Sequence, residues 1–437
     1  MRIQRGSSRF TRAVTQLFLR ASSKIGITGL PAQIQNLLGF GFVFSLGRNI
    51  AYPYLAMYLT GARGAGGLEF DPSFIGFMIM IGTLANTFAY LITGNLCDRF
   101  GRKRMMIFAL TAGSALTALY AFVNSYTEFL LLYAVTGIVL AFYDPAQGAM
   151  IADLVRPEKC EEVYGLSYMI GNIGTMIGPL VGGFVASTKG YPVLFIIAAI
   201  FGLIAAAGFV LFIQESYTPE NAQNFNLSQF AAIFRDRVFI LFCFTGAFTS
   251  LLYSQLYGLL SVYTLYLGFE PYIFGIFFAI NGTLVVALQI PIRLAAVKIG
   301  PTKAFIIAQL LYAAGFTSFM FAKVFIQFLI GVIVLTLGEI TYVPASSGFV
   351  ANLAPSDKRG RYMATIGLFF GTGSAAGSQI AFTLFGSLTN KSLTWGILGI
   401  IGFSTLIGYA LLHRTVNQRR DALAHSNLNI DDNLRSY

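Results

Sequence analysis

The sequence predicts an all-α membrane protein with twelve transmembrane helices, arranged as two six-helix bundles that are parallel repeats of each other. Only 11% of the 437 residues are charged, against about 25% in soluble domains, and the mean hydropathy is +0.70. The apolar residues gather in twelve long stretches. Within these stretches the apolar residues are continuous and do not alternate with polar residues at every second position, so the pattern favours helices over a transmembrane barrel.

Each apolar stretch is long enough to span a bilayer, which takes about 20 residues of helix. The first half of the chain holds six of them, at residues 33–61, 72–95, 103–124, 127–151, 161–187 and 191–213. The second half holds the other six, at residues 238–267, 271–296, 301–322, 324–350, 360–387 and 391–413. We therefore expect five parts: a cytoplasmic basic arm over 1–32, an N-terminal bundle over 33–213, a cytoplasmic linker over 214–237, a C-terminal bundle over 238–413 and a cytoplasmic tail over 414–437.

An internal repeat relates the two halves. The sequence "DPSFIG" at residues 71–76 recurs as "EPYIFG" at residues 270–275, and "DPAQGAMIADL" at 144–154 recurs as "VPASSGFVANL" at 343–353. Gly101 and Gly300 are related by the same offset of 199 residues. The offset corresponds to six helices, an even number, so the two halves have the same orientation in the membrane.

The positive charge predicts the topology. The net charge is +11, and most of the 29 Lys and Arg residues lie in the arm, the even-numbered loops and the tail. The odd-numbered loops hold only Arg63, Lys189, Lys323 and Lys391. Cytoplasmic loops of membrane proteins are enriched in Lys and Arg, so both termini are expected on the cytoplasmic side. The expected location is the cell (inner) membrane. This explanation of the charge disfavours nucleic-acid binding.

The first 32 residues contain six cations and no acid. Phe10, Val14, Leu17 and Phe18 fall along one face of a helix in the segment "RFTRAVTQLFLRASSK". This pattern is typical of an interfacial helix on anionic lipid. A transit peptide has a similar composition and is the alternative.

The loop "GNLCDRFGRKR", residues 94–104, places one acid and four cations between the second and third apolar stretches. Its pattern Gly-x-x-x-Asp-Arg-x-Gly-Arg-Lys-Arg resembles the signature loop of the major facilitator superfamily. The resemblance implies the fold of that family over all twelve helices. It also implies that Asp98 meets the N-terminus of the eleventh helix and that Asp153 pairs with a cation of the loop. The implied conformational latch comprises Gly94, Asp98, Arg99, Gly101, Arg102, Lys103, Arg104 and Asp153.

The fifth apolar stretch carries glycines at every fourth position, at Gly174, Gly178 and Gly182, beside Pro179. Small residues at this spacing let two helices approach closely. The spacing resembles the helix 5 motif of the drug–proton antiporters of the superfamily, and the implied motif comprises Gly165, Gly174, Gly178, Pro179, Gly182 and Gly183. The chain departs from that branch at Tyr133, because the antiporters usually carry an Arg at this position.

Three charged residues lie well inside predicted helices, away from the helix ends: Arg48, Asp144 and Glu339. A charge at the centre of a membrane helix costs about 2.5–3.5 kcal/mol on insertion scales, so each is a candidate functional group. We expect Glu339 and Asp144 to be proton-coupling groups, with Arg48 pairing with Glu339 in one conformation and releasing it in the other. The expected substrate cavity is lined by Asn49, Tyr52, Tyr143, Tyr253, Gln255, Tyr257 and Tyr342.

These observations predict a secondary active transporter that moves small lipophilic or amphipathic compounds by alternating access, with proton-coupled efflux as the favoured mode. An importer or facilitator of a small metabolite is one alternative, and a transporter-like sensor or scaffold without transport is another. An enzyme is not expected, because the sequence shows no nucleophile–base set and no metal-ligand spacing of Cys and His. The expected partners are a small-molecule substrate, protons and the lipid bilayer, with no cofactor, no metal and a monomeric chain.

Overall fold

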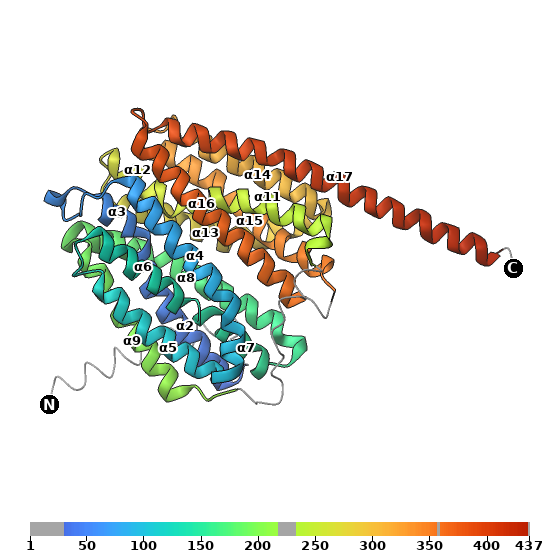
Figure 1. Ribbon diagram of the computed structural model, residues 1–437, viewed down its shortest axis with the longest axis horizontal. Helices are drawn as coiled ribbons and strands as arrows, with labels where there is room; N and C mark the ends of the chain where they lie inside the picture. Colours follow the sequence, from blue (N-terminus) through green and yellow to red (C-terminus); the bar gives the residue numbers. More distant parts are fainter. Residues whose placement is uncertain (1–29, 217–232, 356–358, 436–437) are drawn as a thin grey trace.

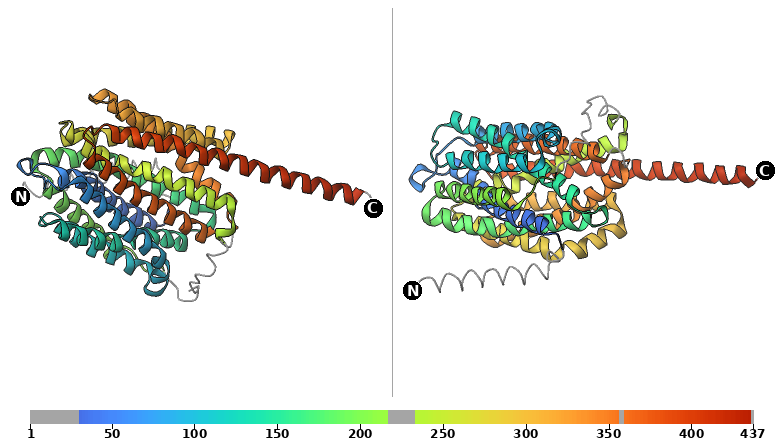
Figure 2. Two further views of the ribbon diagram at one scale, coloured as in Figure 1. Left: turned by 45° about the horizontal axis from the view of Figure 1, so that its top comes forward. Right: turned by 90° about the horizontal axis from the view of Figure 1, so that it is seen from below.

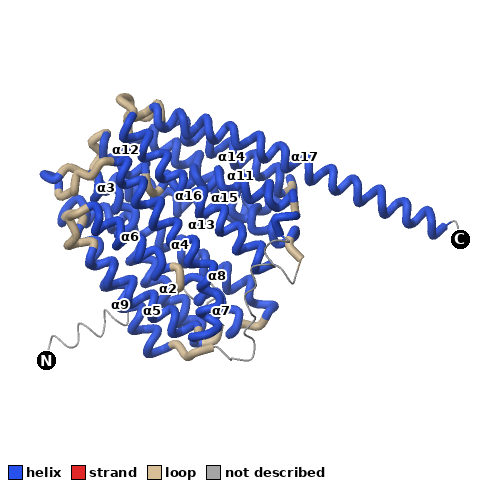
Figure 3. Tube along the Cα trace, viewed as in Figure 1, coloured by secondary structure: helices blue, strands red, loops and turns tan. Residues whose placement is uncertain are grey.

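A computed structural model describes residues 30–216, 233–355 and 359–435 (Figure 1). Apart from its last three positions, the predicted basic arm lies outside the described residues, as does most of the predicted linker. The regular structure of the described residues is helical, with no strand among them (Figure 3). The predicted all-α class is confirmed to that extent.

The first half of the chain forms α2 (Ala32–Ala51), η2 (Tyr52–Tyr54), α3 (Leu55–Thr60), η3 (Arg63–Ala65), α4 (Pro72–Phe100), α5 (Arg102–Leu119), α6 (Tyr126–Leu140), α7 (Tyr143–Leu154), α8 (Pro157–Lys189) and α9 (Pro192–Phe212). The second half forms η5 (Ile233–Arg235), α11 (Arg237–Tyr253), η6 (Ser254–Leu256), α12 (Leu259–Tyr266), α13 (Pro271–Ile299), α14 (Pro301–Phe319), α15 (Phe325–Leu353), α16 (Arg359–Ser387) and α17 (Leu393–Arg435). Figure 1 shows the two sets of helices side by side, the first in blue and green and the second in yellow to red.

The sequence repeat is also a repeat of structure. The helices α4 and α13 each have 29 residues, and their first and last residues are related by the same offset of 199. Each ends at a glycine with positive φ, at 93° for Gly101 and 86° for Gly300. Residues with a side chain rarely adopt this conformation, so a glycine ends the helix at both positions.

Three of the predicted continuous helices are interrupted. The first is divided by η2, which contains Pro53, a residue without a backbone N–H for the helical ladder. The fourth is divided at Ala141 and Phe142, just before Pro145. The seventh is divided at η6 and at Gly258, whose φ and ψ are −95° and −83°. Proline and glycine therefore set these breaks, and each break lies in the second half of its predicted span.

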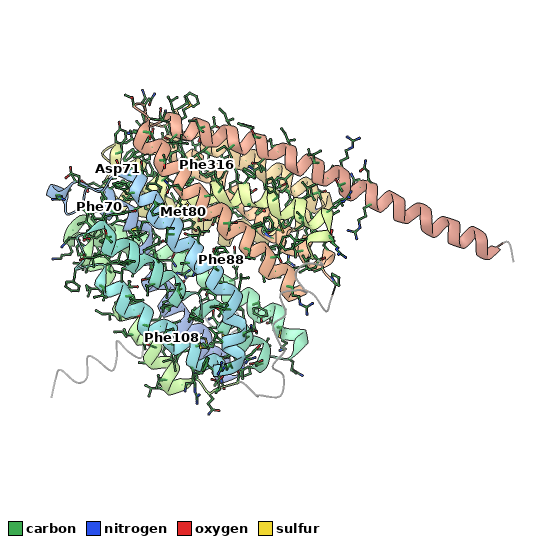
Figure 4. The ribbon with its side chains drawn as sticks, in the orientation of Figure 1. Phe70, Asp71, Met80, Phe88, Phe108 and Phe316 are labelled. Carbon is green, nitrogen blue, oxygen red and sulfur yellow. The ribbon has the colours of Figure 1, made fainter. Side chains whose placement is uncertain are left out.

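Eight helical segments of the described chain are long and apolar enough to cross a membrane: 72–100, 126–154, 162–189, 192–212, 237–266, 271–299, 325–350 and 393–419. Large apolar side chains are exposed on the outer surface of the helices, as Phe88 on α4 and Phe108 on α5 illustrate (Figure 4). The helix α5 is not among the eight, and three of its 18 residues are cations. The chain is a multi-pass membrane protein, and the count of twelve spans stays a prediction.

The last helix is longer than predicted. The helix α17 continues past residue 413 to Arg435 and projects beyond the other helices (Figures 1 and 2). Its middle is held by two contacts: His413 Nδ1 lies 2.7 Å from Thr302 Oγ1, and Arg419 Nη1 lies 3.8 Å from Asp236 Oδ1. The predicted boundary between bundle and tail is therefore not a break in the helix.

Candidate functional site

The two sets of helices meet at one end of the molecule and separate at the other. We call the end that carries the turn at Gly101 the basic end, and the end with the loops after α3 and α12 the far end. Toward the far end, Gly76 of α4 lies against Phe382 of α16, and Gly275 of α13 lies against Pro179 of α8. Toward the basic end, several glycines have open space around them, so that a side chain added there would meet no neighbour within 4 Å. They are Gly94, Gly165, Gly360 and Gly367. The interface therefore opens toward the basic end.

Two cavities lie in this opening. The larger, of about 510 Å³, is bordered by residues of both sets of helices, among them Asn49, Tyr52, Asn86, Tyr253 and Tyr257. The smaller, of about 370 Å³, lies nearer the basic end and includes Tyr143, Gln147 and Tyr168. Both cavities are bordered by Arg48 and Asp144.

The helix breaks place these two charges. Arg48 is in the last turn of α2, where the helix dipole favours a cation, and Asp144 is in the first turn of α7, where it favours an anion. Both side chains are exposed in the cavities. The hydroxyl of Tyr90 donates a hydrogen bond of 2.9 Å to Asp144 Oδ2. The Arg48 side chain makes no hydrogen bond and no ion pair with any other residue that the structure describes.

The third charge of the predicted spans lies behind the larger cavity. Glu339 on α15 is only 7% exposed. The Tyr253 hydroxyl donates to its Oε1 at 2.8 Å, and Asn281 Nδ2 donates to its Oε2 at 3.0 Å. Asn281 also donates to Thr336 Oγ1 at 2.9 Å. Tyr253 borders the cavity, and its hydroxyl lies 3.3 Å from that of Tyr257, so the two tyrosines connect the cavity with the buried carboxyl group.

The structure does not pair Arg48 with Glu339. Both oxygens of Glu339 are occupied by neutral donors, whereas Arg48 shares the cavities with Asp144. The prediction relied on similar depths in the membrane, and depth does not give the direction of a side chain around the helix axis. The expected ion pair between the halves is therefore not a feature of this conformation.

The predicted cavity residues divide into three groups. Asn49, Tyr52, Tyr253 and Tyr257 border the larger cavity and Tyr143 the smaller. Gln255 and Tyr342 lie outside both linings. Gln255 is fully buried and donates from Nε2 to Leu251 O at 2.9 Å, and Tyr342 accepts a hydrogen bond of 3.1 Å from Tyr409. Their polar groups are turned into the packing of the second half.

Sequence reasoning missed several polar residues of the site: Thr83, Asn86, Tyr90, Thr175, Asn281 and Thr336. A signal was present in α4, where Thr83, Asn86 and Tyr90 follow one another at helical spacing on one face of an apolar helix. Asn281 is the equivalent signal in α13, a lone amide in a long apolar segment.

The predicted latch loop forms a network around Arg102. Its Nη2 lies 2.9 Å from Asp98 Oδ1, and its Nε lies 3.1 Å from Asp153 Oδ2. Glu215, which the sequence analysis did not single out, accepts hydrogen bonds from the backbone N–H groups of Arg102 and Lys103 at 2.9 and 3.1 Å. The carboxylate thereby caps the N-terminus of α5, where the helix dipole favours an anion.

Other latch residues lie around this network. The guanidinium of Arg99 stacks over the ring of Phe100, 5.4 Å from its centroid, and Lys103 Nζ donates to Val210 O at 3.0 Å. Arg104 is exposed on the first turn of α5, and Gly94 is exposed on α4. Asp98 pairs with Arg102 of its own loop. Residues 356–358, just before α16, lie outside the described residues, so the expected contact of Asp98 with the start of the eleventh helix stays a prediction.

We expect Asp98→Asn to leave the protein folded and to lower transport severalfold, because it removes a carboxylate that pairs with Arg102. The Asp98 side chain is 35% exposed, and ion pairs near the surface contribute about 1 kcal/mol or less. The measurement is transport together with thiol labelling of Cys160, which is partly exposed at the basic end. Lys298→Gln is the control and should transport like the wild type, because Lys298 is an exposed cation in the last turn of α13, outside the latch. Wild-type transport and labelling in Asp98→Asn would contradict the latch assignment.

The glycines of the predicted helix 5 motif have different neighbours. Gly174 and Gly178 face α2, where an added side chain would lie 2.7 Å from Ser45 Oγ and 2.6 Å from Asn49 Cβ. Gly182 also faces α2 and lies against the backbone of Ile50. Gly183 lies against Tyr272 of α13, and Pro179 accepts a hydrogen bond from the Tyr54 hydroxyl. Gly165 has open space around it. Most of the motif thus holds α8 close to α2 and α13.

Comparison with protein families gives a match over most of the chain. Residues 37–301 and 274–428 match the family model described as Major Facilitator Superfamily. A Na(+), Li(+), K(+)/H(+) antiporter of Planococcus maritimus is 28% identical over 400 residues, which cover 83% of this chain and 91% of the relative. The multidrug resistance protein MdtH of Yersinia enterocolitica is 26% identical over 393 residues, which cover 86% of this chain and 92% of the relative.

Solved structures share the fold. A POT family transporter crystallised with a thioalcohol-conjugated peptide superposes with a TM-score of 0.77 at 12% identity, over 89% of this chain and 99% of the other. The human organic anion transporter MFSD10 (TETRAN) superposes with a TM-score of 0.65 at 17% identity, over 86% of this chain and 99% of the other. At such identities the likeness extends to the fold alone.

Proposed function

The chain belongs to the major facilitator superfamily, and we propose that it is a secondary active transporter that exports small lipophilic or amphipathic compounds in exchange for protons. The observation that carries the proposal is the larger cavity. It lies between the two sets of helices, beside the broken helices, and contains two exposed opposite charges among aromatic and small polar side chains. Discontinuous helices around a site at mid-membrane are typical of secondary transporters.

Alternating access accounts for the shape of the interface. The contacts of α4 with α16 and of α8 with α13 close the far end, and the cavity opens at the basic end. In the proposed cycle, the two halves rock about the cavity, so the basic end closes and the far end opens. The cavity then faces the two sides of the membrane in turn.

The topology completes the proposal. The chain crosses the inner membrane twelve times as two six-helix bundles and works as a monomer. The basic end faces the cytoplasm, because it carries the cations of the loop at 99–104 and a cytoplasmic location fits such a loop. Both termini lie on that side. In the described conformation the cavity is therefore open to the cytoplasm, the side from which an exporter takes its substrate.

Proton coupling is assigned to the carboxyl group of Glu339. Tyr253 and Tyr257 connect it with the cavity by hydroxyl groups, which both donate and accept hydrogen bonds. Glu339 can therefore gain or lose a proton while keeping its neighbours. The curated relatives support ion-coupled export, because one is named as a cation/proton antiporter and another as a multidrug resistance protein.

The test is transport by the purified protein in proteoliposomes with an imposed proton gradient, with a lipophilic cationic dye, a set of drugs and common metabolites as substrates. We expect uptake against a concentration gradient when protons flow in the opposite direction, and none when the gradient is collapsed. Transport of one compound at the same rate with and without the gradient would indicate a facilitator instead. Absence of transport for all compounds would favour a sensor or scaffold.

A further inference from the structure

Arg48 is the most unusual group in the cavity. Arg48 lies in the last turn of α2, near the middle of the first predicted span, and its side chain is exposed to the cavity. Its guanidinium has neither a hydrogen bond nor an ion pair with the other residues described in the structure. A charge at this depth is costly unless it meets water or an opposite charge. An arginine whose planar group is left open inside a binding cavity is suited to a carboxylate or another planar anion, which it can bind through two parallel hydrogen bonds.

The surroundings of Arg48 supply further donors. Four tyrosines border the same cavities as Arg48. Tyr52, Tyr90 and Tyr257 border the larger cavity, and Tyr143 borders the smaller. An anionic group bound at Arg48 would therefore have neutral hydroxyl groups nearby and an apolar aromatic wall behind them.

Asp144 provides the opposite charge in the same space. It borders both cavities, as Arg48 does, and it is exposed there, but it forms no ion pair with Arg48 in the described structure. One of its oxygens accepts the hydrogen bond from Tyr90. Its other oxygen has no recorded donor within the described part of the chain and is open to a ligand.

From this arrangement we infer that the transported compound is a zwitterion with a lipophilic body, whose anionic group binds Arg48 and whose protonated amine binds Asp144. The inference rests on the proposed transport function and names its substrate class. A purely cationic compound meets the repulsion of Arg48, and a purely anionic compound meets that of Asp144. Only a molecule with both charges satisfies both side chains. A cavity of about 510 Å³ has room for such a molecule with an aromatic body.

The test uses three compounds with the same apolar body: biphenylalanine, which is zwitterionic, its decarboxylated amine and its deaminated acid. Equilibrium binding to the full-length protein in lipid nanodiscs is measured for each. We expect biphenylalanine to bind at least about tenfold more tightly than either analogue, a ratio that corresponds to about 1.4 kcal/mol. In Arg48→Gln the preference over the amine should disappear, and in Asp144→Asn the preference over the acid should disappear. Arg63→Gln is the control, because Arg63 is an exposed cation outside the cavities, and it should bind like the wild type.

Different results overturn different statements. If wild-type protein binds the amine as tightly as biphenylalanine, or if Arg48→Gln weakens all three compounds equally, Arg48 is not the anion site and the inference is wrong. Transport of a lipophilic cationic dye is measured in parallel. Dye transport without binding of biphenylalanine would refute the inference and leave the proposed function standing. If biphenylalanine does not bind and none of the dye, the drugs and the metabolites is transported, the proposed function is refuted as well.

Discussion

Glu339→Gln is expected to abolish accumulation driven by a proton gradient and to spare downhill exchange. A pH difference of one unit supplies about 1.4 kcal/mol per proton, which sustains about a tenfold concentration ratio in a one-to-one exchange. The glutamine has nearly the same shape and can still accept the hydrogen bond from Tyr253, but it cannot take up or release a proton in this range. The ratio should therefore fall to about one, while counterflow of labelled substrate between equal pH values continues.

Two further variants make this prediction specific. Tyr253→Phe removes the hydroxyl between the cavity and Glu339, and we expect gradient-driven transport to slow while the final ratio is retained. Asp144→Asn should change the affinity for substrate more than the coupling, because Asp144 is exposed in the cavity. Undiminished accumulation in Glu339→Gln would refute the assignment. If coupling were lost in Asp144→Asn alone, the proton site would lie on α7.

Gly178→Leu is expected to abolish transport. The first carbon of a side chain at this position would lie 2.6 Å from Asn49 Cβ and 2.8 Å from the Asn49 carbonyl carbon, closer than packed atoms can approach. The helices α2 and α8 must then separate. Overpacking of this kind costs about 1–3 kcal/mol, and the displaced segment of α2 contains Arg48. The measurement is transport in proteoliposomes, with thermal unfolding to report the fold.

Controls on the same helix separate close packing from a general intolerance of large side chains. Val181→Leu changes an exposed position, 41% accessible, and should transport like the wild type. The smaller substitution Gly178→Ala should still fold but should lose part of the transport activity, because a single methyl group already meets Asn49. Equal transport by Gly178→Leu and Val181→Leu would mean that the contact between α2 and α8 has no special role.

The sequence was most informative where the pattern is periodic. The long apolar stretches predicted the helices, and the offset of 199 residues predicted the repeat of the two halves. The structure shows that repeat in α4 and α13, whose first and last residues differ by the same offset. The loop at 94–104 predicted the family, which the family match confirms. The sequence was less informative about which side chains contact each other. Glu215 is distant in sequence from Arg102 and has no pattern that links it to the loop, and Asn281 is distant in the same way from Glu339.

The sequence by itself determined the helical class, the family and the positions of three intramembrane charges, because hydrophobic length, repeats and a contiguous motif are all properties of the chain in one dimension. Only the tertiary structure decided how those charges are combined. Depth along a helix follows from residue number at about 1.5 Å per residue, but the direction of a side chain around the axis depends on the helix breaks and on the neighbours that pack against it. That direction leaves Arg48 and Asp144 open in one cavity and encloses Glu339 among Tyr253, Asn281 and the packed helices of the second half.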